Sequence, residues 1–211
     1  MKTNKRFDPN ATRRKHFIAL VMKRVQPGTG SGLDFLERRT YMQPVIDLKT
    51  IISKTPFVIV GGLATRLYMP ERLTLDLDIL VLTQQASQLY HELEQAGSRR
   101  VGKLNIEGSQ WELPDGTSLD VLEAQAHWAT EAIATPNPAP DGLPYIALPY
   151  LVLMKLQASR SQDLADVSRM MGGVQEPTLT EVKKVIQAYL PNASEDLESL
   201  IMLGQLERSQ P

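Results

Sequence analysis

The sequence predicts an α+β fold, in which a small mixed β-sheet with flanking helices precedes a C-terminal helical bundle. Two observations predict it. Short runs rich in β-branched residues are confined to the middle of the chain, whereas apolar residues recur at helical spacing on both sides. A Pro-Asp-Gly turn at 114–116 also joins two strand-like runs, 109–113 and 117–124, as in a β-hairpin. The order is therefore helices, an α/β core and a helical region.

The remaining elements follow from the same patterns along the chain. Helical spacing predicts helices, and short β-branched runs predict strands. The expected helices cover 13–25, 44–54, 63–69, 84–96, 149–160, 162–171, 178–190 and 194–208, and the further strands cover 57–60 and 74–82. These elements predict three parts: a basic arm and helix at 1–42, the α/β core at 43–135 and a helical region at 136–211.

Composition excludes several classes of protein. With 42% hydrophobic residues, the 211-residue chain can bury a core, and the absence of cysteine excludes disulfides and thiolate metal sites. The longest apolar run, 56–64, is too short for a membrane span of about 20 residues. The basic N-terminus has no uninterrupted apolar segment of the secretory type. We therefore expect a cytoplasmic protein without a membrane partner.

Charge is distributed unevenly along the chain. Residues 1–40 hold ten Lys or Arg against three Asp or Glu, a net +7, so the remainder carries −8 of the overall −1. A basic arm on an acidic body favours a polyanionic partner, and RNA is the one we expect. The helix at 13–25 would dock through Phe17, Leu20 and Val21, leaving its basic side for the RNA backbone. The alternative is a solvated terminus. The basic residues are Lys2, Lys5, Arg6, Arg13, Arg14, Lys15, Lys23 and Arg24.

Two acidic residues stand two positions apart in the run 74–82. Because side chains alternate across a strand, Asp76 and Asp78 are expected on one face, with Cα atoms roughly 6.6 Å apart. Two such carboxylates repel by about 4 kcal/mol at 4 Å for an effective dielectric of 20. A bound cation removes that repulsion, and hard oxygen ligands suit Mg²⁺ or Mn²⁺. The pair therefore predicts a divalent metal site.

Gly61 and Gly62 stand between a predicted strand and a predicted helix. Glycines at such a junction let the backbone approach phosphate closely, and amides at a helix N-terminus favour an anion. A third carboxylate, Asp120, lies on the second strand of the hairpin. If that strand lies beside the Asp76–Asp78 strand, Asp120 becomes a third metal ligand; otherwise it is an exposed edge residue. Glu112 and Glu123 are weaker candidates for the same role.

These residues carry a resemblance. The string 61-GGLATRLYMPERLTLDLDILV-81 resembles the Gly-Gly-x-Ala…Thr-x-Asp-x-Asp signature of the polymerase-beta-like nucleotidyltransferase superfamily, and within it the AbiE-type (AbiEii-like) toxin group. The string 148-LPYLVLMKLQASRSQDLADV-167 resembles a second feature of that group, a helix with Lys followed by a basic residue and Asp-x-x-Asp. The matching positions are Lys155, Arg160, Asp163 and Asp166.

The resemblance implies a function and a set of site residues. It implies a nucleotidyltransferase core whose Mg²⁺ or Mn²⁺ supports transfer of a nucleoside monophosphate from a nucleoside triphosphate to an acceptor hydroxyl. An RNA 3′ end is the expected acceptor and an antitoxin protein the expected partner. The implied catalytic residues are Asp76, Asp78, Asp120, Lys155 and Asp163, of which the first three bind metal. The implied nucleotide-binding residues are Gly61, Gly62, Thr65, Arg66, Lys155 and Arg160. The helical region at 136–211 would complete the cleft, with Lys155 mattering more for catalysis than for folding.

One departure keeps other functions open. Many members of the superfamily have Ser or Thr directly after the glycines, whereas this chain has Leu63. Thr65 or backbone amides would then have to bind the phosphates. The alternatives are a catalytically silent binding module, such as an antitoxin or RNA-binding partner, and an enzyme acting on a small-molecule acceptor. A glycosyltransferase using Asp-x-Asp fits less well, because the spacing from the glycines is short.

Overall fold

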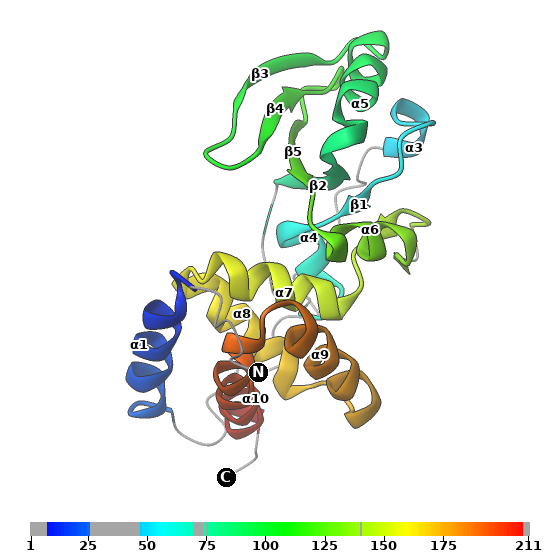
Figure 1. Cartoon of the computed structure of the whole chain (residues 1–211). Helices are drawn as coiled ribbons and strands as arrows, with labels where there is room; N and C mark the ends of the chain where they lie inside the picture. The colour runs from blue at the N-terminus through cyan, green and yellow to red at the C-terminus, as the bar shows by residue number, and fades with distance from the viewer. Residues whose placement is uncertain (1–7, 26–46, 70–73, 75, 140, 209–211) are drawn as a thin grey trace, which may run out of the picture. The chain divides into compact units, whose positions relative to one another are not determined.

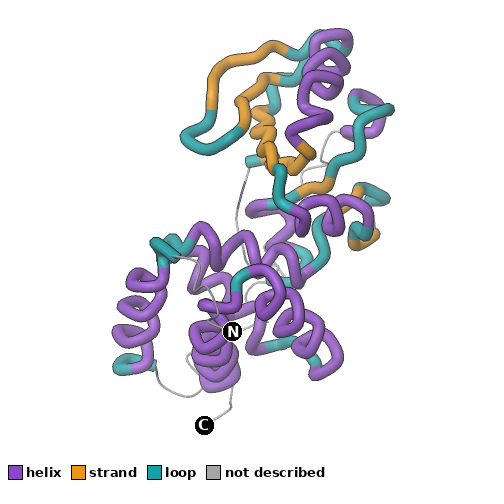
Figure 2. Tube along the Cα trace, viewed as in Figure 1, coloured by secondary structure: helices purple, strands orange, loops and turns teal. Residues whose placement is uncertain are grey.

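The computed structural model describes residues 8–25, 47–69, 74, 76–139 and 141–208, which belong to two compact units. The first combines Met1–Leu33 with Leu148–Pro211, and we call it the helical unit. The second spans Asp34–Ala147 and is called the sheet unit. All described strands lie in the sheet unit (Figure 2). The predicted three-part division at 1–42, 43–135 and 136–211 stays a prediction.

The described strands of the sheet unit form one mixed sheet in the order β3-β4-β5-β2-β1-β7-β6 (Figure 1). β2 pairs in parallel with β5 and antiparallel with β1, while β4 pairs antiparallel with both β3 and β5. The short β7 pairs with β1 and β6. The strands are β1 (Val58–Ile59), β2 (Leu77–Leu82), β3 (Arg99–Lys103), β4 (Gly108–Glu112), β5 (Ser118–Ala124), β6 (Asn137–Pro138) and β7 (Pro144–Tyr145).

One face of this sheet is covered by α5 (Thr83–Gln95), which packs against β2 and β5. Tyr90 of α5 lies against Trp111 of β4, with ring centroids 5.3 Å apart. Leu119 stands opposite Trp111 in the β4–β5 register, and Leu77 stands opposite Leu119. Since side chains alternate along a strand, the residues next to these point to the opposite face. The other described helices of this unit are α3 (Leu48–Ile51), α4 (Gly61–Arg66) and α6 (His127–Ala134).

The helical unit is built from helices whose apolar residues pack together. Its helices are α1 (Ala11–Met22), α7 (Leu148–Ala158), α8 (Ser161–Gly172), α9 (Glu176–Tyr189), α10 (Ser194–Arg208) and the 3₁₀ helix η2 (Pro191–Ala193). The α8–α10 contact is especially close, because a Cβ on Gly172 would collide with the backbone of Gly204. None of the helices in the described residues is long and apolar enough to cross a membrane.

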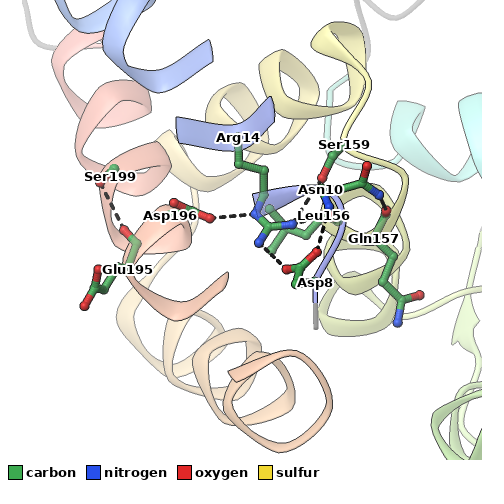
Figure 3. Close-up of polar contacts among 9 residues, drawn as sticks. All are labelled: Asp8, Asn10, Arg14, Leu156, Gln157, Ser159, Glu195, Asp196 and Ser199. Atoms are coloured by element: carbon green, nitrogen blue, oxygen red, sulfur yellow. Dashed lines mark hydrogen bonds and ion pairs between the residues drawn. The ribbon is translucent and has the colours of Figure 1, made fainter. Parts of the chain in front are cut away.

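The docking of α1 differs from the prediction. Leu20 is 59% exposed, whereas Arg14 is completely buried. The Arg14 guanidinium donates to Asp8, to Asp196 at 2.6 Å, and to the Leu156 carbonyl and Ser159 hydroxyl at 3.3 Å each (Figure 3). A buried guanidinium is stable only with such partners. The prediction that this helix docks through Phe17, Leu20 and Val21 is therefore wrong for Leu20, whereas Phe17 and Val21 are half-buried. Arg14 is the buried residue of the helix.

The expected fold class is confirmed: a mixed sheet with flanking helices precedes a helical region. The four C-terminal helices lie within about three residues of their predicted bounds. Several expectations were wrong in detail. Within the described part of the expected helix 44–54, helix is found at Leu48–Ile51, and residues 44–46 lie outside the described residues. The strand expected from 74 begins at Leu77, and β3, α6, β6 and β7 were not predicted.

Candidate functional site

The strongest candidate site lies on the sheet face opposite α5. Asp78 of β2 and Asp120 of β5 are register partners in a parallel pair, so the expectation that their strands lie side by side is confirmed. Their strand axes are about 4.8 Å apart and their side chains point to the same face. Both residues are half-buried. The fold thus places two carboxylates next to each other at the edge of an apolar core.

The glycine pair packs directly against this site. Gly61 has a φ of +62°, which favours glycine, and a Cβ there would collide with the Asp78 Oδ2 atom. A Cβ on Gly62 would lie 2.6 Å from the Thr74 hydroxyl oxygen. The Val60 amide also donates to the Asp78 carbonyl at 2.9 Å. The two glycines are needed because the backbone turns into α4 in contact with Asp78 and Thr74.

Asp76 lies outside the strand that was predicted to hold it. It is exposed and precedes β2, and its amide donates to the Thr74 hydroxyl at 3.3 Å. In the part of the chain that the structure describes, no three His, Cys, Asp or Glu side chains are grouped so that they could hold a metal ion. Because β2 begins at Leu77, the prediction that Asp76 lies within the strand was wrong, and its metal-binding role stays a prediction.

The two remaining carboxylates still fit a magnesium ion. Mg²⁺ in nucleotide sites is commonly bound by one or two carboxylates, with substrate phosphates and water as the other ligands. Asp78 and Asp120 supply hard oxygen donors side by side, and Gly61 adds no side chain beside Asp78. Such a pair can bind a metal–nucleotide complex without a third protein ligand.

Gln110 is a residue of this site that sequence reasoning missed. It stands opposite Asp120 in the β4–β5 register, and its Nε2 atom donates to Asp120 Oδ1 at 3.1 Å. The signal was present in the sequence. Counting back from the turn at 114–116 pairs 112 with 118 and hence 110 with 120, as the structure has them.

The other residues predicted around the glycines have less support. Thr65 is completely buried, and its hydroxyl donates to the Gly61 carbonyl at 2.8 Å, so its partner lies within α4. Its predicted contact with nucleotide has no support from this geometry. Arg66 is half-buried in the last turn of α4. The nucleotide-binding role of Arg66 stays a prediction.

Glu92, which was not predicted, anchors the loop that leads into β1. Its carboxylate accepts from the amides of Ser53 and Lys54 at 2.7 and 2.8 Å and from the Thr55 hydroxyl. Burial alone would raise the pKa of Glu92, but these hydrogen bonds outweigh it and lower the pKa. The strand before the glycine pair is thereby held to α5.

The second predicted motif is assembled within the helical unit. Lys155 of α7 is only 7% exposed, and its Nζ atom lies 2.7 Å from Asp166 Oδ2 and 3.4 Å from Asp163 Oδ1, both on α8. Arg160, whose side chain is 76% exposed, donates through Nε to Asp163 Oδ2 at 2.6 Å. The four motif residues form one ion cluster. The expectation that Lys155 matters little for folding conflicts with its burial between two carboxylates.

A separate cavity of about 450 Å³ lies at the C-terminal ends of β2 and β5. None of the predicted site residues lines it. Its lining residues are Leu82, Thr83, Gln84, Ala124, Gln125 and Thr130.

No protein-family model matches the chain, and no curated protein matches it significantly. Among solved structures, it is similar to the antibiotic-resistance factor ANT(2'')-Ia, with 15% identity over 94% of this chain and 93% of that chain and a TM-score of 0.37. It is also similar to a CCA-adding enzyme in complex with CTP, with 18% identity over 70% of this chain and 44% of that chain and a TM-score of 0.35. It is similar as well to the Cid1 poly(U) polymerase, with 17% identity over 79% of this chain and 46% of that chain and a TM-score of 0.29.

Proposed function

We propose that this protein is a divalent-metal-dependent nucleotidyltransferase that moves a nucleoside monophosphate from a nucleoside triphosphate to an acceptor hydroxyl. The observation that carries the proposal is the placement of Asp78 beside Asp120, with the Gly61 backbone against Asp78. A carboxylate pair next to a glycine turn combines hard metal ligands with space for phosphate. The motif resemblance of 61–81 supports the same reaction.

The reaction exchanges one phosphorus–oxygen bond for another. The acceptor oxygen attacks the α-phosphorus, the bond to the β-phosphate oxygen breaks, and pyrophosphate leaves with its electron pair. Mg²⁺ or Mn²⁺, when bound, would neutralise charge on the triphosphate and make the acceptor hydroxyl more acidic. Asp78 and Asp120 would hold the metal, and Asp76, two residues before Asp78, stays a predicted third ligand.

The proton of the acceptor hydroxyl needs a carboxylate to receive it. Among the described residues, Asp120 accepts one hydrogen bond, from Gln110 at Oδ1. The two oxygens of a carboxylate offer about four lone-pair sites, so Asp120 has sites left both for the metal and for this proton. Both oxygens of Asp163, in contrast, accept hydrogen bonds from Arg160, and Oδ1 also accepts one from Lys155. We therefore assign proton acceptance to Asp120 rather than to Asp163.

Within the helical unit, Arg160 suits a phosphate contact better than Lys155 does. The Arg160 side chain is exposed, although its guanidinium already donates through Nε and Nη2 to the two oxygens of Asp163. Lys155 is buried and already balanced by Asp163 and Asp166. We propose that Lys155 holds Asp163 in place, and the nucleotide-binding role of Arg160 stays a prediction.

An RNA 3′ end as acceptor, an antitoxin partner and a cytoplasmic location remain part of the proposal, carried by the motif resemblance. Arg14 cannot contribute to RNA binding, because it is buried. The basic residues of α1 and its end that are exposed are Arg13, Lys15, Lys23 and Arg24. Four phosphate contacts would give RNA affinity a log–log salt slope of about −3. Deleting residues 1–7 and replacing these four side chains by Gln would flatten that slope.

A second candidate is a catalytically silent binding module. Two observations favour it: Leu63 stands where phosphate-binding members have Ser or Thr, and no cluster of three metal-ligating side chains occurs among the described residues. Such a module would bind nucleotide or RNA without transfer.

Transfer can be tested by incubating the protein with each labelled nucleoside triphosphate, Mg²⁺ and total RNA. We expect label on RNA with the wild type and with Asp115→Asn, which changes an exposed turn acid outside the site. Asp78→Asn and Asp120→Asn should each abolish it. Nucleotide binding without transfer by the wild type would decide for the silent module, and transfer by Asp78→Asn would overturn the proposed metal site.

A further inference from the structure

Five residues from neighbouring segments form one row across the sheet. Gly102 of β3 stands opposite Gln110 of β4, which stands opposite Asp120 of β5, and Asp120 is the register partner of Asp78 in β2. Beyond Asp78 comes Gly61, where a Cβ would collide with Asp78 Oδ2. The row therefore holds two carboxylates and one amide, with a glycine at each end.

The end beside Gln110 depends on an irregularity in β3. The β3–β4 register shifts between Arg100 and Gly102, so Val101 has no partner and Gly102 moves opposite Gln110. A Cβ on Gly102 would lie 3.9 Å from Gln110 Oε1. The bulge thus places a residue without a side chain beside the amide oxygen, and the amide can lie flat across the strands.

The orientation of the Gln110 amide follows from its neighbour. An ionised carboxylate has no proton to donate, so the group 3.1 Å from Asp120 Oδ1 must be the amide nitrogen. Oε1 then faces Gly102, in agreement with the 3.9 Å approach. This single arrangement restricts rotation of the Asp120 carboxylate.

We propose that Gln110 is a positioning residue, which holds Asp120 Oδ1 so that Oδ2 is presented to a divalent cation bound with nucleotide. This inference rests on the proposed function. Groups that donate to a metal-ligating carboxylate orient it, and their loss typically weakens metal affinity by about 10- to 100-fold. A neutral donor suits the task, because it fixes the carboxylate without cancelling its charge.

The charge of Asp120 distinguishes a positioning role of Gln110 from a purely structural role. Asp120 has no ion pair among the residues that the structure describes, and its described donor is this amide. A Lys or Arg at position 110 would satisfy Asp120 equally well but would occupy the place of the cation. Within the row, Gln110 therefore leaves the Asp120 charge to attract a divalent ion.

The test compares Gln110→Met with Glu112→Met. Methionine preserves the length of Gln110 but cannot donate. Glu112 lies on the same strand and face, and we no longer propose it as a metal ligand, because its carboxylate pairs with Arg99 at the surface. Mn²⁺ binding is measured by electron paramagnetic resonance, with Mn²⁺ alone and with each of four nonhydrolysable nucleoside triphosphate analogues. Melting temperatures are measured without ligand.

We expect Gln110→Met to raise the Mn²⁺ dissociation constant about 10- to 100-fold, while its ligand-free melting temperature stays within about 3 °C of the wild type. Glu112→Met should bind Mn²⁺ like the wild type. Equal Mn²⁺ affinity of Gln110→Met and wild type would overturn the positioning role but leave the proposed function intact. A large drop in melting temperature with unchanged affinity would make the bond purely structural. Failure of the wild type to bind Mn²⁺ with any nucleotide would overturn the proposed function and this inference together.

Discussion

The two units balance their acidic side chains in different ways. In the helical unit, the buried carboxylates of Asp163, Asp166 and Asp196 accept from a buried cation, either Lys155 or Arg14. In the sheet unit, Glu92 and Asp120 accept instead from neutral donors: backbone amides, a hydroxyl and the Gln110 amide. The three acids of the helical unit have their charge balanced by a buried cation, whereas Glu92 and Asp120 are held in place by neutral donors and keep their charge.

This difference in the donors predicts that the acids of the two units contribute differently to stability and to ligand binding. Internal ion pairs make each partner necessary, because removing one leaves a buried charge that costs several kcal/mol. Neutral donors orient a carboxylate but leave its charge to attract a cation from solution. We therefore expect substitutions in the helical unit to change the free energy of unfolding, and those at Asp78 and Asp120 to change ligand binding.

The largest effect is expected at Arg14. Arg14→Met leaves the carboxylates of Asp8 and Asp196 without their cation and should lower the free energy of unfolding by about 3 to 5 kcal/mol. Burial alone would raise the pKa of Asp8, but Arg14 and the backbone amides of Asn10 and Ala11 together outweigh burial and lower the pKa. Urea denaturation measures the change.

The adjacent Arg13 provides the control for Arg14, since it is exposed on the same helix. Arg13→Met should change the free energy of unfolding by less than about 0.5 kcal/mol. Equal effects of the two substitutions would mean that the Arg14 cluster does not hold α1 to the other helices.

A somewhat smaller effect is expected at Lys155. Lys155→Met removes the cation between Asp163 and Asp166 and should cost about 3 kcal/mol of unfolding free energy, because Arg160 still pairs with Asp163. The double variant Lys155→Met with Asp166→Asn should recover part of this loss, since one uncompensated charge is removed with the lysine. A loss that does not recover would place the effect in packing rather than charge.

The sequence allowed much of the fold to be predicted but not these ion clusters. Helical spacing and β-branched runs depend on neighbouring residues, so the C-terminal helices and the hairpin were recognisable. Arg14 and Asp196 are 182 positions apart, and no local pattern indicates that they meet. Arg14 looked like one more charge of a basic arm, although folding makes it the anchor of α1.

The candidate site was predictable in part for the same reason. The Asp78–Asp120 pairing follows from strand adjacency, and the turn at 114–116 would have indicated Gln110. Asp76 was misplaced because composition does not reveal where a strand begins. Glu92 could not be found, since Ser53 and Lys54 bind it through backbone amides, which carry no sequence signal, and Thr55, which binds it through its hydroxyl, is 37 positions away.

A carboxylate that is held by neutral donors should make the free energy of unfolding depend on pH. The pKa of Glu92 is lowered in the folded protein, so its stabilisation is complete above the unfolded value of about 4.3 and is lost as pH falls through the lower folded value. Glu92→Gln should cost about 2 kcal/mol at pH 7 and reduce the slope of stability against pH below about pH 4.3. Parallel pH profiles for the two proteins would show that the carboxylate contributes no charge-dependent stability.

The smallest change in stability, with the largest change in binding, is expected at the carboxylate pair itself. In Asp78→Asn with Asp120→Asn, both side chains keep an acceptor oxygen and their mutual repulsion is removed. The free energy of unfolding without ligand should therefore stay within about 1 kcal/mol of the wild type or rise slightly. When Mg²⁺ and nucleotide are present at a hundredfold excess over the dissociation constant, the free energy of unfolding of the wild type should rise by about 2.7 kcal/mol. That of the variant should not change. Thermal melts with and without these ligands measure both quantities, and Glu112→Gln serves as a surface control on the same sheet face.

A variant that is strongly destabilised without ligand would mean that the sheet unit, like the helical unit, uses these acids to hold its fold. That result would remove the distinction between the two units and with it the main support for a metal site.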